Sequence, residues 1–442
     1  MKSQKIDSLV YQAVFGSNLE KQQARFQIWN LAQKAKIYPA SINDFYLARG
    51  QNKLPHNFTV PAINLRGMVY ESAQAVFKTA KKLNVGALIC ELARSEMGYT
   101  NQPPQEYACV VMAAALREDW SGPLFIQADH FQAKADDNSK PKKGEIDTIK
   151  KLIIESINAG FYNIDIDMST LVDLDKPTEA EQQTNNIKYS INIVQFIRKI
   201  EPKGITVSLG GEIGHIGGKN STLKDFTAYM DGFNKGLSKN LVGMSKISPQ
   251  TGTHHGGVVL ADGSLADINV DFHLLSEMSK LGRKKYGLGG TVQHGASTLP
   301  DKFFGEFVKS QALEVHLATG FQNIQMDHPA FPKNLLKKMY RWIDEAKQDE
   351  KKPNQTTEQF HYKLRKKAWG QFKKETWDIP EAKKLKIRSA LEDRFTFMFK
   401  ALNVANTTKM VAEFTKPLVI NKTKQDFSTK FESVKQVKGL AD

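Results

Sequence analysis

The sequence predicts an α/β protein that folds as one (β/α)₈ barrel with helical extensions at both ends. Between about Phe58 and Pro332, short apolar, β-branched runs alternate with longer runs of helical periodicity, which is typical of β-α units around a parallel sheet. There are eight such runs, the number that closes a barrel. The first run leads into AINLRGMVYES, which is not a glycine-rich phosphate turn and disfavours a doubly wound open sheet.

The eight expected strands are short and follow one another at intervals that leave room for a helix. They are TVPAIN (59–64), VGALICE (85–91), LFIQAD (124–129), YNIDID (162–167), ITVSLGGE (205–212), LVGMSK (241–246), GLGGTVQH (287–294) and FQNIQMD (321–327). Helical periodicity fills the intervals, as in ESAQAVFKTAKKL and QEYACVVMAAALRE. We therefore expect a barrel over residues 58–332, an N-terminal helical extension over 1–57 and a basic C-terminal helical extension over 333–442.

The positive charge of the chain is concentrated in its C-terminal part. Residues 331–442 hold 26 Lys and Arg against 14 Asp and Glu, a net charge of +12 out of +15 for the whole chain. These basic residues lie on amphipathic patterns such as KLRKKAWGQFKKE, where solvated helix faces are the simplest explanation. Contacts to a substrate phosphate or a weak polyanion site stay open, but we expect no nucleic acid partner because no binding module is recognisable.

The ends and the cysteines indicate a cytoplasmic protein. The first residues, MKSQKIDSLVYQAVFG, are charged and lack the apolar stretch of a secretory signal, and no apolar run is long enough for a membrane span. Cys90 and Cys109 lie in apolar surroundings and are expected to be buried free thiols.

Histidines follow three of the expected strands. His130 follows the third strand, His254 and His255 follow the sixth, and His294 ends the seventh. A lone histidine there is more often a helix cap, but the C-terminal strand ends of a barrel meet at one rim, and three imidazoles around an open position suit Zn²⁺ or another divalent cation. No CxxC pair exists for a structural zinc site.

Glycines and carboxylates lie beside these histidines. The segments GGEIGHIGG (210–218), HHGG (254–257) and HGAST (294–298) allow backbone N–H groups to approach an anion, although each could be a simple turn. Carboxylates lie at the ends of the third, fourth, fifth and eighth expected strands and could act as acid, base, orienting group or ligand; they are Asp129, Asp165, Asp167, Glu212 and Asp327.

Taken in order, these segments resemble the class II, metal-dependent fructose-bisphosphate aldolases and their tagatose-bisphosphate relatives. QADH resembles the Asp-His pair of the family, TGTHHGG its TSHG segment, VQHGAST its HGGSG segment and NIQMD its NIDTD segment, while GGEIGHIGG resembles the stretch that follows the fifth strand. The resemblance covers about residues 59–327 and implies reversible aldol cleavage of a ketose (bis)phosphate such as fructose 1,6-bisphosphate.

The resemblance also implies a role for each matching position. It makes His130, His255 and His294 the metal ligands, with Glu212 and Asp167 as secondary ligands. It makes Asp129 the residue that exchanges a proton with the C4 hydroxyl group and Asn323 the residue that contacts the enediolate region. The implied phosphate-binding positions are Gly218, Gly256, Gly295 and Ser297. It further implies a homodimer or homotetramer.

The chain departs from the family pattern at three places, one of which is Ala296, where the family has a glycine after HG. Lys219, Asn220 and Ser221 stand where many members carry acidic residues, one of which handles the carbon proton. Gln325 and Met326 replace an aspartate and a threonine that help to hold phosphate. These departures keep two alternatives open: a metal-dependent sugar or sugar-phosphate epimerase on the same barrel, and a non-catalytic aldolase-like subunit.

Overall fold

Eight parallel strands close into a barrel in the computed structural model, which describes residues 2–214, 219–252 and 270–428. The barrel strands are β2 (Val60–Asn64), β3 (Ile89–Ala93), β4 (Gly122–Gln132), β5 (Asn163–Asp167), β6 (Ser208–Glu212), β7 (Lys246–Ser248), β8 (Gly290–Gln293) and β9 (Glu314–Leu317). Each strand pairs with the next in parallel, and β9 pairs with β2, which closes the ring. The predicted (β/α)₈ fold is confirmed.

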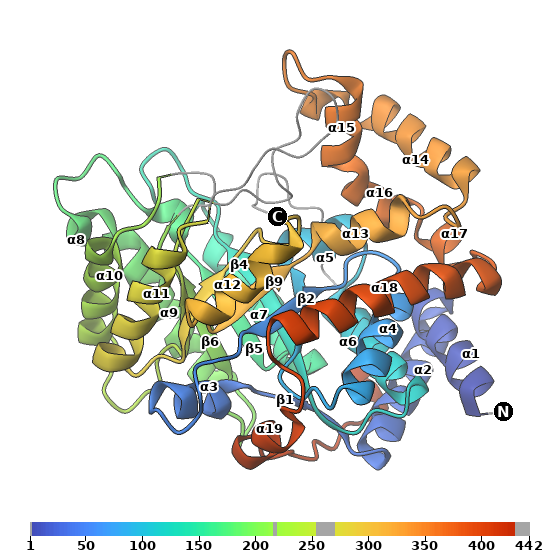
Figure 1. The fold of residues 1–442 in the computed structure, drawn as a ribbon, viewed down its shortest axis with the longest axis horizontal. Helices are drawn as coiled ribbons and strands as arrows, with labels where there is room; N and C mark the ends of the chain where they lie inside the picture. Colours follow the sequence, from blue (N-terminus) through green and yellow to red (C-terminus); the bar gives the residue numbers. More distant parts are fainter. Residues whose placement is uncertain (1, 215–218, 253–269, 429–442) are drawn as a thin grey trace.

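Helices cover the outside of the barrel, and several carry the capping residues that their sequences suggest (Figure 1). The helices that follow the barrel strands are α4 (Val69–Lys82), α5 (Arg94–Tyr99), α6 (Pro104–Arg117), α7 (Glu145–Ala159), α8 (Glu179–Gln182), α9 (Thr184–Ile200), α10 (Leu223–Gly236), α11 (Phe272–Leu281), α12 (Phe304–Lys309) and α13 (Thr319–Met326). Thr222, for example, begins α10 with a capping box to Asp225. No helix of the described ranges is both long and apolar enough to span a membrane.

The last barrel strand differs from the sequence expectation. The strand expected over 321–327 is wrong, because residues 321–326 lie in α13 and Asp327 caps its end, and the strand is Glu314–Leu317 instead. Phe321 and Ile324 are three residues apart, a spacing that suits a helix rather than an alternating strand. The sixth strand is also displaced, from 241–246 to Lys246–Ser248, so Lys246 begins that strand instead of ending it.

The N-terminal residues add a strand as well as helices. They form α1 (Lys2–Phe15), α2 (Asn18–Lys34), β1 (Ile37–Ala40) and α3 (Asn43–Gly50). The expectation of helices and a polar loop over 1–57 missed β1, which pairs in parallel with the start of β4 outside the barrel. Pro39 is tolerated there because β1 is an edge strand.

The C-terminal residues form helices, as expected. They are α14 (Lys333–Ala346), α15 (Thr357–Leu364), α16 (Ala368–Gln371), α17 (Lys373–Trp377), α18 (Glu381–Ala401) and α19 (Thr408–Phe414). In Figure 1, α14 and α15 project beyond the barrel, whereas α18 runs across it. α18 packs on α4, where Arg388 pairs with Glu71 at 2.8 Å. The division of the chain into three parts, with boundaries after residues 57 and 332, stays a prediction.

The inside of the barrel contains a buried ion network rather than only apolar side chains. Lys246 lies at its centre, 2.9 Å from Asp165 and 2.5 Å from Glu314, and its Nζ donates to Gln127 at 2.7 Å. Tyr46, from the N-terminal residues, donates its hydroxyl hydrogen to Glu314. Burial lowers the pKa of Lys246, but the two carboxylates outweigh burial and raise that pKa above its ordinary value. Lys246 is therefore a structural cation.

Replacing Lys246 by methionine should destabilise the barrel strongly. The variant leaves Asp165 and Glu314 buried without their counter-ion, and breaking a buried pair in this way costs about 3–5 kcal/mol. The measurement is the free energy of unfolding in urea, with Lys309→Met as the control because Lys309 forms an exposed pair with Glu306. If the two substitutions lowered the free energy of unfolding by the same amount, the buried ion network would not be what stabilises the barrel.

Candidate metal and substrate site

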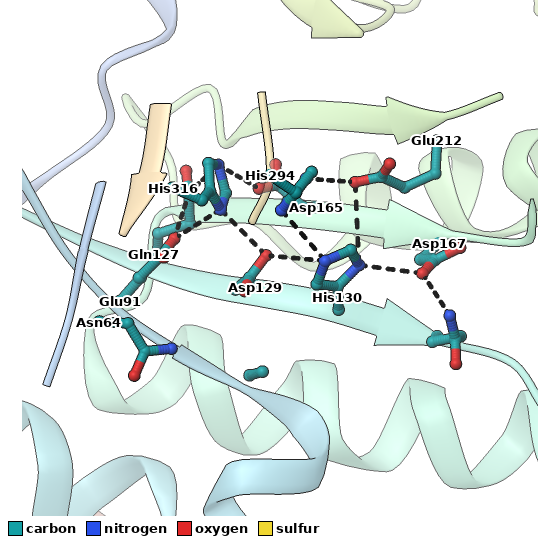
Figure 2. Close-up of polar contacts among 12 residues, drawn as sticks. Asn64, Glu91, Gln127, Asp129, His130, Asp165, Asp167, Glu212, His294 and His316 are labelled. Atoms are coloured by element: carbon teal, nitrogen blue, oxygen red, sulfur yellow. Dashed lines mark hydrogen bonds and ion pairs between the residues drawn. The ribbon is translucent and has the colours of Figure 1, made fainter. Parts of the chain in front are cut away.

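A bulge in β4 directs two consecutive polar side chains toward the barrel mouth. The register against β5 shifts between Ala128 and Phe131, so that β4 carries one extra residue there. His130 lies in the bulge with φ of 41°, a left-handed conformation that a non-glycine residue adopts at a cost. Successive side chains of a regular strand point to opposite faces. The bulge removes this alternation, and Asp129 and His130 both join the same polar cluster (Figure 2).

Two imidazole rings face each other at the centre of the cluster. Nε2 of His130 lies 3.1 Å from Nδ1 of His294, and both side chains are almost fully buried. The other nitrogen of each ring has a carboxylate partner. Nδ1 of His130 is 3.0 Å from Asp167, and Nε2 of His294 is 2.9 Å from Glu212.

The carboxylates determine what the facing nitrogens can do. A carboxylate accepts the proton of the nitrogen that faces it, so the two facing nitrogens are left with lone pairs that repel each other unless a cation lies between them. A proton can meet this need, and so can a metal ion. Two nitrogen ligands of a tetrahedral Zn²⁺ lie about 3.3 Å apart, close to the observed separation. Asp129, His130 and His294 each offer a ligand atom, and these atoms lie within 4.8 Å of one another. The donor set therefore fits a divalent cation of the zinc type.

Asp167 and Glu212 orient the histidines in this arrangement. Asp167 also accepts hydrogen bonds from Ser169 at 2.6 Å and from Gln132 at 2.7 Å. Burial raises the pKa of Asp167, but the bonds from His130 and Ser169 outweigh it and hold that pKa below its ordinary value. Burial raises the pKa of Glu212 well above its ordinary value. Carboxylates in such positions fix the ring orientation and the tautomer of metal-binding histidines.

The field at this site favours cations. Burial alone would lower the pKa of His130, but Asp129, Asp167 and Glu212 outweigh it and raise that pKa well above its ordinary value. The same negative potential attracts a divalent ion, which would displace protons on binding. Metal affinity should therefore weaken as the pH falls.

A third histidine, His316, extends the cluster on the other side of His294. Its Nδ1 lies 3.0 Å from Glu91 and 3.2 Å from Asp129, and its Nε2 lies 2.6 Å from Glu314. Burial raises the pKa of Glu91 to about 8. Sequence reasoning missed His316 and Glu314, because LEVHLA (313–318) was not recognised as the last barrel strand. Its apolar, alternating pattern directly after a helical stretch was the signal that could have revealed them.

A small cavity of about 30 Å³ adjoins these side chains. Asp129, His294 and His316 line it, together with Gly295 and Ser297 from the loop after β8. Other polar side chains in its wall are Asn64, Arg66, Glu96 and Thr319. The cavity therefore brings one predicted proton-transfer residue, one predicted metal ligand and two predicted phosphate-binding positions to the same place.

Asn323 lies apart from this cavity wall. It is in α13, where its amide group donates to Tyr362 at 2.9 Å and accepts from Arg365 at 2.7 Å. Its expected role depended on a strand end that the structure places elsewhere, and its contacts give that role no support. Gln325 is buried and donates to the carbonyl oxygen of Gly67 and to the hydroxyl group of Ser72. His254, His255, Gly218 and Gly256 lie outside the described residues, and their roles stay predictions.

Comparison with known proteins identifies the family. The family model described as "Fructose-bisphosphate aldolase class-II" matches residues 51–373, most of the chain. The chain belongs to the class II fructose-bisphosphate aldolase family. No curated protein matches it.

Solved structures support the fold. The fructuronate-tagaturonate epimerase UxaE from Cohnella laeviribosi aligns with a TM-score of 0.59 at 11% identity, over 87% of this chain and 86% of that one. A probable tagatose 6 phosphate kinase from Sinorhizobium meliloti 1021 aligns with a TM-score of 0.51 at 13% identity, over 85% of this chain and 97% of that one. At these identities the likeness concerns the fold.

For this member of the class II aldolase family, Asp167→Asn should weaken zinc binding by about 10–100-fold, because the amide no longer holds His130 in its metal-binding tautomer. The measurement is zinc affinity in competition with a chromophoric chelator. Asp175→Asn is the control, since Asp175 is exposed. If Asp167→Asn bound zinc as tightly as wild type, Asp167 would have no role in metal binding.

Proposed function

We propose that this protein is a metal-dependent aldolase that reversibly cleaves a ketose phosphate, such as fructose 1,6-bisphosphate, into dihydroxyacetone phosphate and an aldehyde. The observation that carries the proposal is the pair of buried imidazole nitrogens 3.1 Å apart, each oriented by its own carboxylate, beside a carboxylate that can exchange a proton. A divalent cation such as Zn²⁺, when bound there, supplies Lewis-acid polarisation of the substrate carbonyl and stabilises the negative charge that cleavage develops.

His130 and His294 hold the cation in this proposal, with His255 as the expected third ligand. Asp167 and Glu212 orient these two ligands. Asp167 faces Nδ1 of His130 and Glu212 faces Nε2 of His294, and these are the ring nitrogens that point away from the other histidine. This replaces their expected role as secondary ligands with an orienting role. Family membership supports metal dependence in general, while the identity of the ion is part of the proposal.

Asp129 is the proposed acid and base. Cleavage of the C3–C4 bond requires removal of the proton from the C4 hydroxyl group, and condensation requires its return. Asp129 lines the cavity beside His294, and Nδ1 of His316 lies 3.2 Å from its Oδ1. This contact fixes the direction of the carboxylate. Asp129 can therefore serve the reacting hydroxyl while the two metal-holding histidines stay in place.

Gly295 and Ser297 are proposed to hold the phosphate of the dihydroxyacetone half. Both line the cavity, and Gly295 has φ of 70°, a conformation in which its N–H can approach an anion. Gly218 and Gly256 are proposed to complete the phosphate site. A cytoplasmic homodimer or homotetramer that binds neither nucleic acid nor membranes belongs to the same proposal.

A second candidate is a metal-dependent sugar or sugar-phosphate epimerase. Lys219, Asn220 and Ser221 favour it, because they stand where the aldolases that the chain resembles carry proton-transfer carboxylates. UxaE is named as an epimerase, but that name describes the relative, and its likeness at 11% identity concerns the fold.

Metal removal should abolish the proposed activity. Wild-type protein loaded with Zn²⁺ should release triose phosphate from fructose 1,6-bisphosphate in a coupled assay, EDTA should stop the release, and added Zn²⁺ should restore it. His294→Ala should lose activity and stoichiometric metal together, because one of the two facing ligands is gone. A protein that epimerises ketoses without releasing a triose would favour the second candidate.

Asp129→Asn should lower kcat by about 10²–10⁴-fold, the usual contribution of a positioned acid or base, while metal content stays stoichiometric. The measurement pairs the coupled assay with metal analysis. Asp137→Asn is the control, since Asp137 is exposed in the loop after β4. Full activity of Asp129→Asn would assign the proton transfer to another group.

A further inference from the structure

Tyr46 brings a polar group from the N-terminal residues into the interior of the barrel. It lies in α3 and is fully buried. Its hydroxyl group donates to Oε2 of Glu314, the first residue of β9. A residue from outside the barrel strands therefore contributes a hydrogen-bond donor to the buried ion network.

Buried hydrogen bonds hold α3 at the end of the barrel where the strands begin. The side chain of Asn163, the first residue of β5, accepts from the N–H of Ile42 at 2.9 Å and donates to the carbonyl oxygen of Ala40 at 3.2 Å. The guanidinium group of Arg49 donates to the carbonyl oxygen of Gln311 at 3.2 Å, shortly before β9. These contacts on both sides of Tyr46 fix its ring at the end of the barrel opposite the mouth.

The two oxygens of Glu314 have different partners. Oε1 lies 2.5 Å from Nζ of Lys246, 2.9 Å from Nε2 of Gln127 and 2.6 Å from Nε2 of His316. Oε2 accepts the bond from Tyr46. Burial raises the pKa of Glu314, but Lys246 and His316 outweigh burial and lower that pKa to about 2, so both oxygens are acceptors. Burial and the charge of Glu314 raise the pKa of Tyr46 well above its ordinary value, so its hydroxyl group keeps its proton and donates it.

Strand β9 carries this contact toward the mouth. Glu314 and His316 are two residues apart on the strand, so their side chains project to the same side, the interior of the barrel. The imidazole ring is rigid, so the contact that fixes Nε2 of His316 also fixes the direction of Nδ1. Nδ1 lies 3.2 Å from Oδ1 of Asp129 (Figure 2). Tyr46, Glu314, His316 and Asp129 therefore form one chain of contacts from α3 to the small cavity.

We propose that Tyr46 is a positioning residue for the acid and base Asp129: it holds Glu314, and through Glu314 it holds His316 in the orientation that directs the Asp129 carboxylate. The inference rests on the proposed function. Without the hydroxyl group, the buried Oε2 of Glu314 loses this donor, which is an unfavourable state. The carboxylate then turns Oε2 toward Lys246, whose ammonium group has three hydrogens to donate, and Oε1 moves away from His316.

The test compares zinc-loaded, full-length wild type with Tyr46→Phe and with the control Tyr70→Phe. The control is matched, because Tyr70 is also buried and its hydroxyl group donates to a carboxylate, that of Asp7, at 2.7 Å. Tyr70 lies in α4 and Asp7 in α1, both outside the barrel strands. Steady-state cleavage of fructose 1,6-bisphosphate and zinc content are measured for all three proteins.

Tyr46→Phe should lower kcat by about ten-fold or more and leave KM within about two-fold, because a displaced acid or base slows the chemical step without removing a substrate contact. Its zinc content should stay stoichiometric, since His130 and His294 keep their carboxylate partners. Tyr70→Phe should match wild type in all three quantities. Equal kcat values of the two variants would overturn the proposal, and so would a loss of zinc in Tyr46→Phe, because Tyr46 would then support the site as a whole.

Nuclear magnetic resonance of protein with isotopically labelled histidine rings separates failure of this inference from failure of the proposed function. The signals of His316 are assigned by their absence in His316→Gln. Tyr46→Phe should shift the ring-nitrogen signals of His316, and Tyr70→Phe should leave them in place. If wild type cleaves no ketose phosphate, the proposed function fails, and these signals alone decide whether Tyr46 holds His316. Identical His316 signals in wild type and both tyrosine variants would overturn the inference.

Discussion

The proposed chemistry depends on two buried imidazole nitrogens that face each other at 3.1 Å. This contact needs a cation, because the carboxylates of Asp167 and Glu212 occupy the opposite nitrogen of each ring. The geometry exists only because β4 bulges at His130, which accepts an unfavourable backbone conformation to do so. Strain of this kind costs about 1–3 kcal/mol and persists where surrounding contacts fix it. Here the bond from His130 to Asp167 and the buried strands on either side supply those contacts.

The interior of the barrel supports this arrangement electrostatically. Four carboxylates lie in the polar interior close to His316 or Lys246: Glu91, Asp129, Asp165 and Glu314. Lys246 provides a fixed positive charge beside Asp165 and Glu314, and its raised pKa keeps it charged. An amine held in the ammonium form is no nucleophile, which agrees with a metal-dependent rather than a Schiff-base route.

The sequence predicted the barrel and much of the site because both follow from local patterns. Apolar runs of five or so residues reveal strands, and polar residues at their ends meet at one rim. His130, His294, Asp129, Asp167 and Glu212 do come together as their positions suggested. The bulge in β4 could not be predicted from the sequence, because a one-residue shift in the register between two strands leaves no mark on the spacing of the apolar residues. His316 was missed and Asn323 was misplaced for one reason: NIQMD resembles a family motif that follows a strand, but in this chain it lies at the end of the helix α13, and the strand precedes it.

X-ray absorption spectroscopy of the zinc-loaded, full-length protein tests the central claim most directly. The account predicts stoichiometric zinc with at least two imidazole ligands at about 2.0–2.1 Å, visible through the multiple scattering of their rings. A shell made only of oxygen atoms, or a protein that takes up no stoichiometric metal, would contradict the assignment of the His130–His294 pair as the metal-holding element.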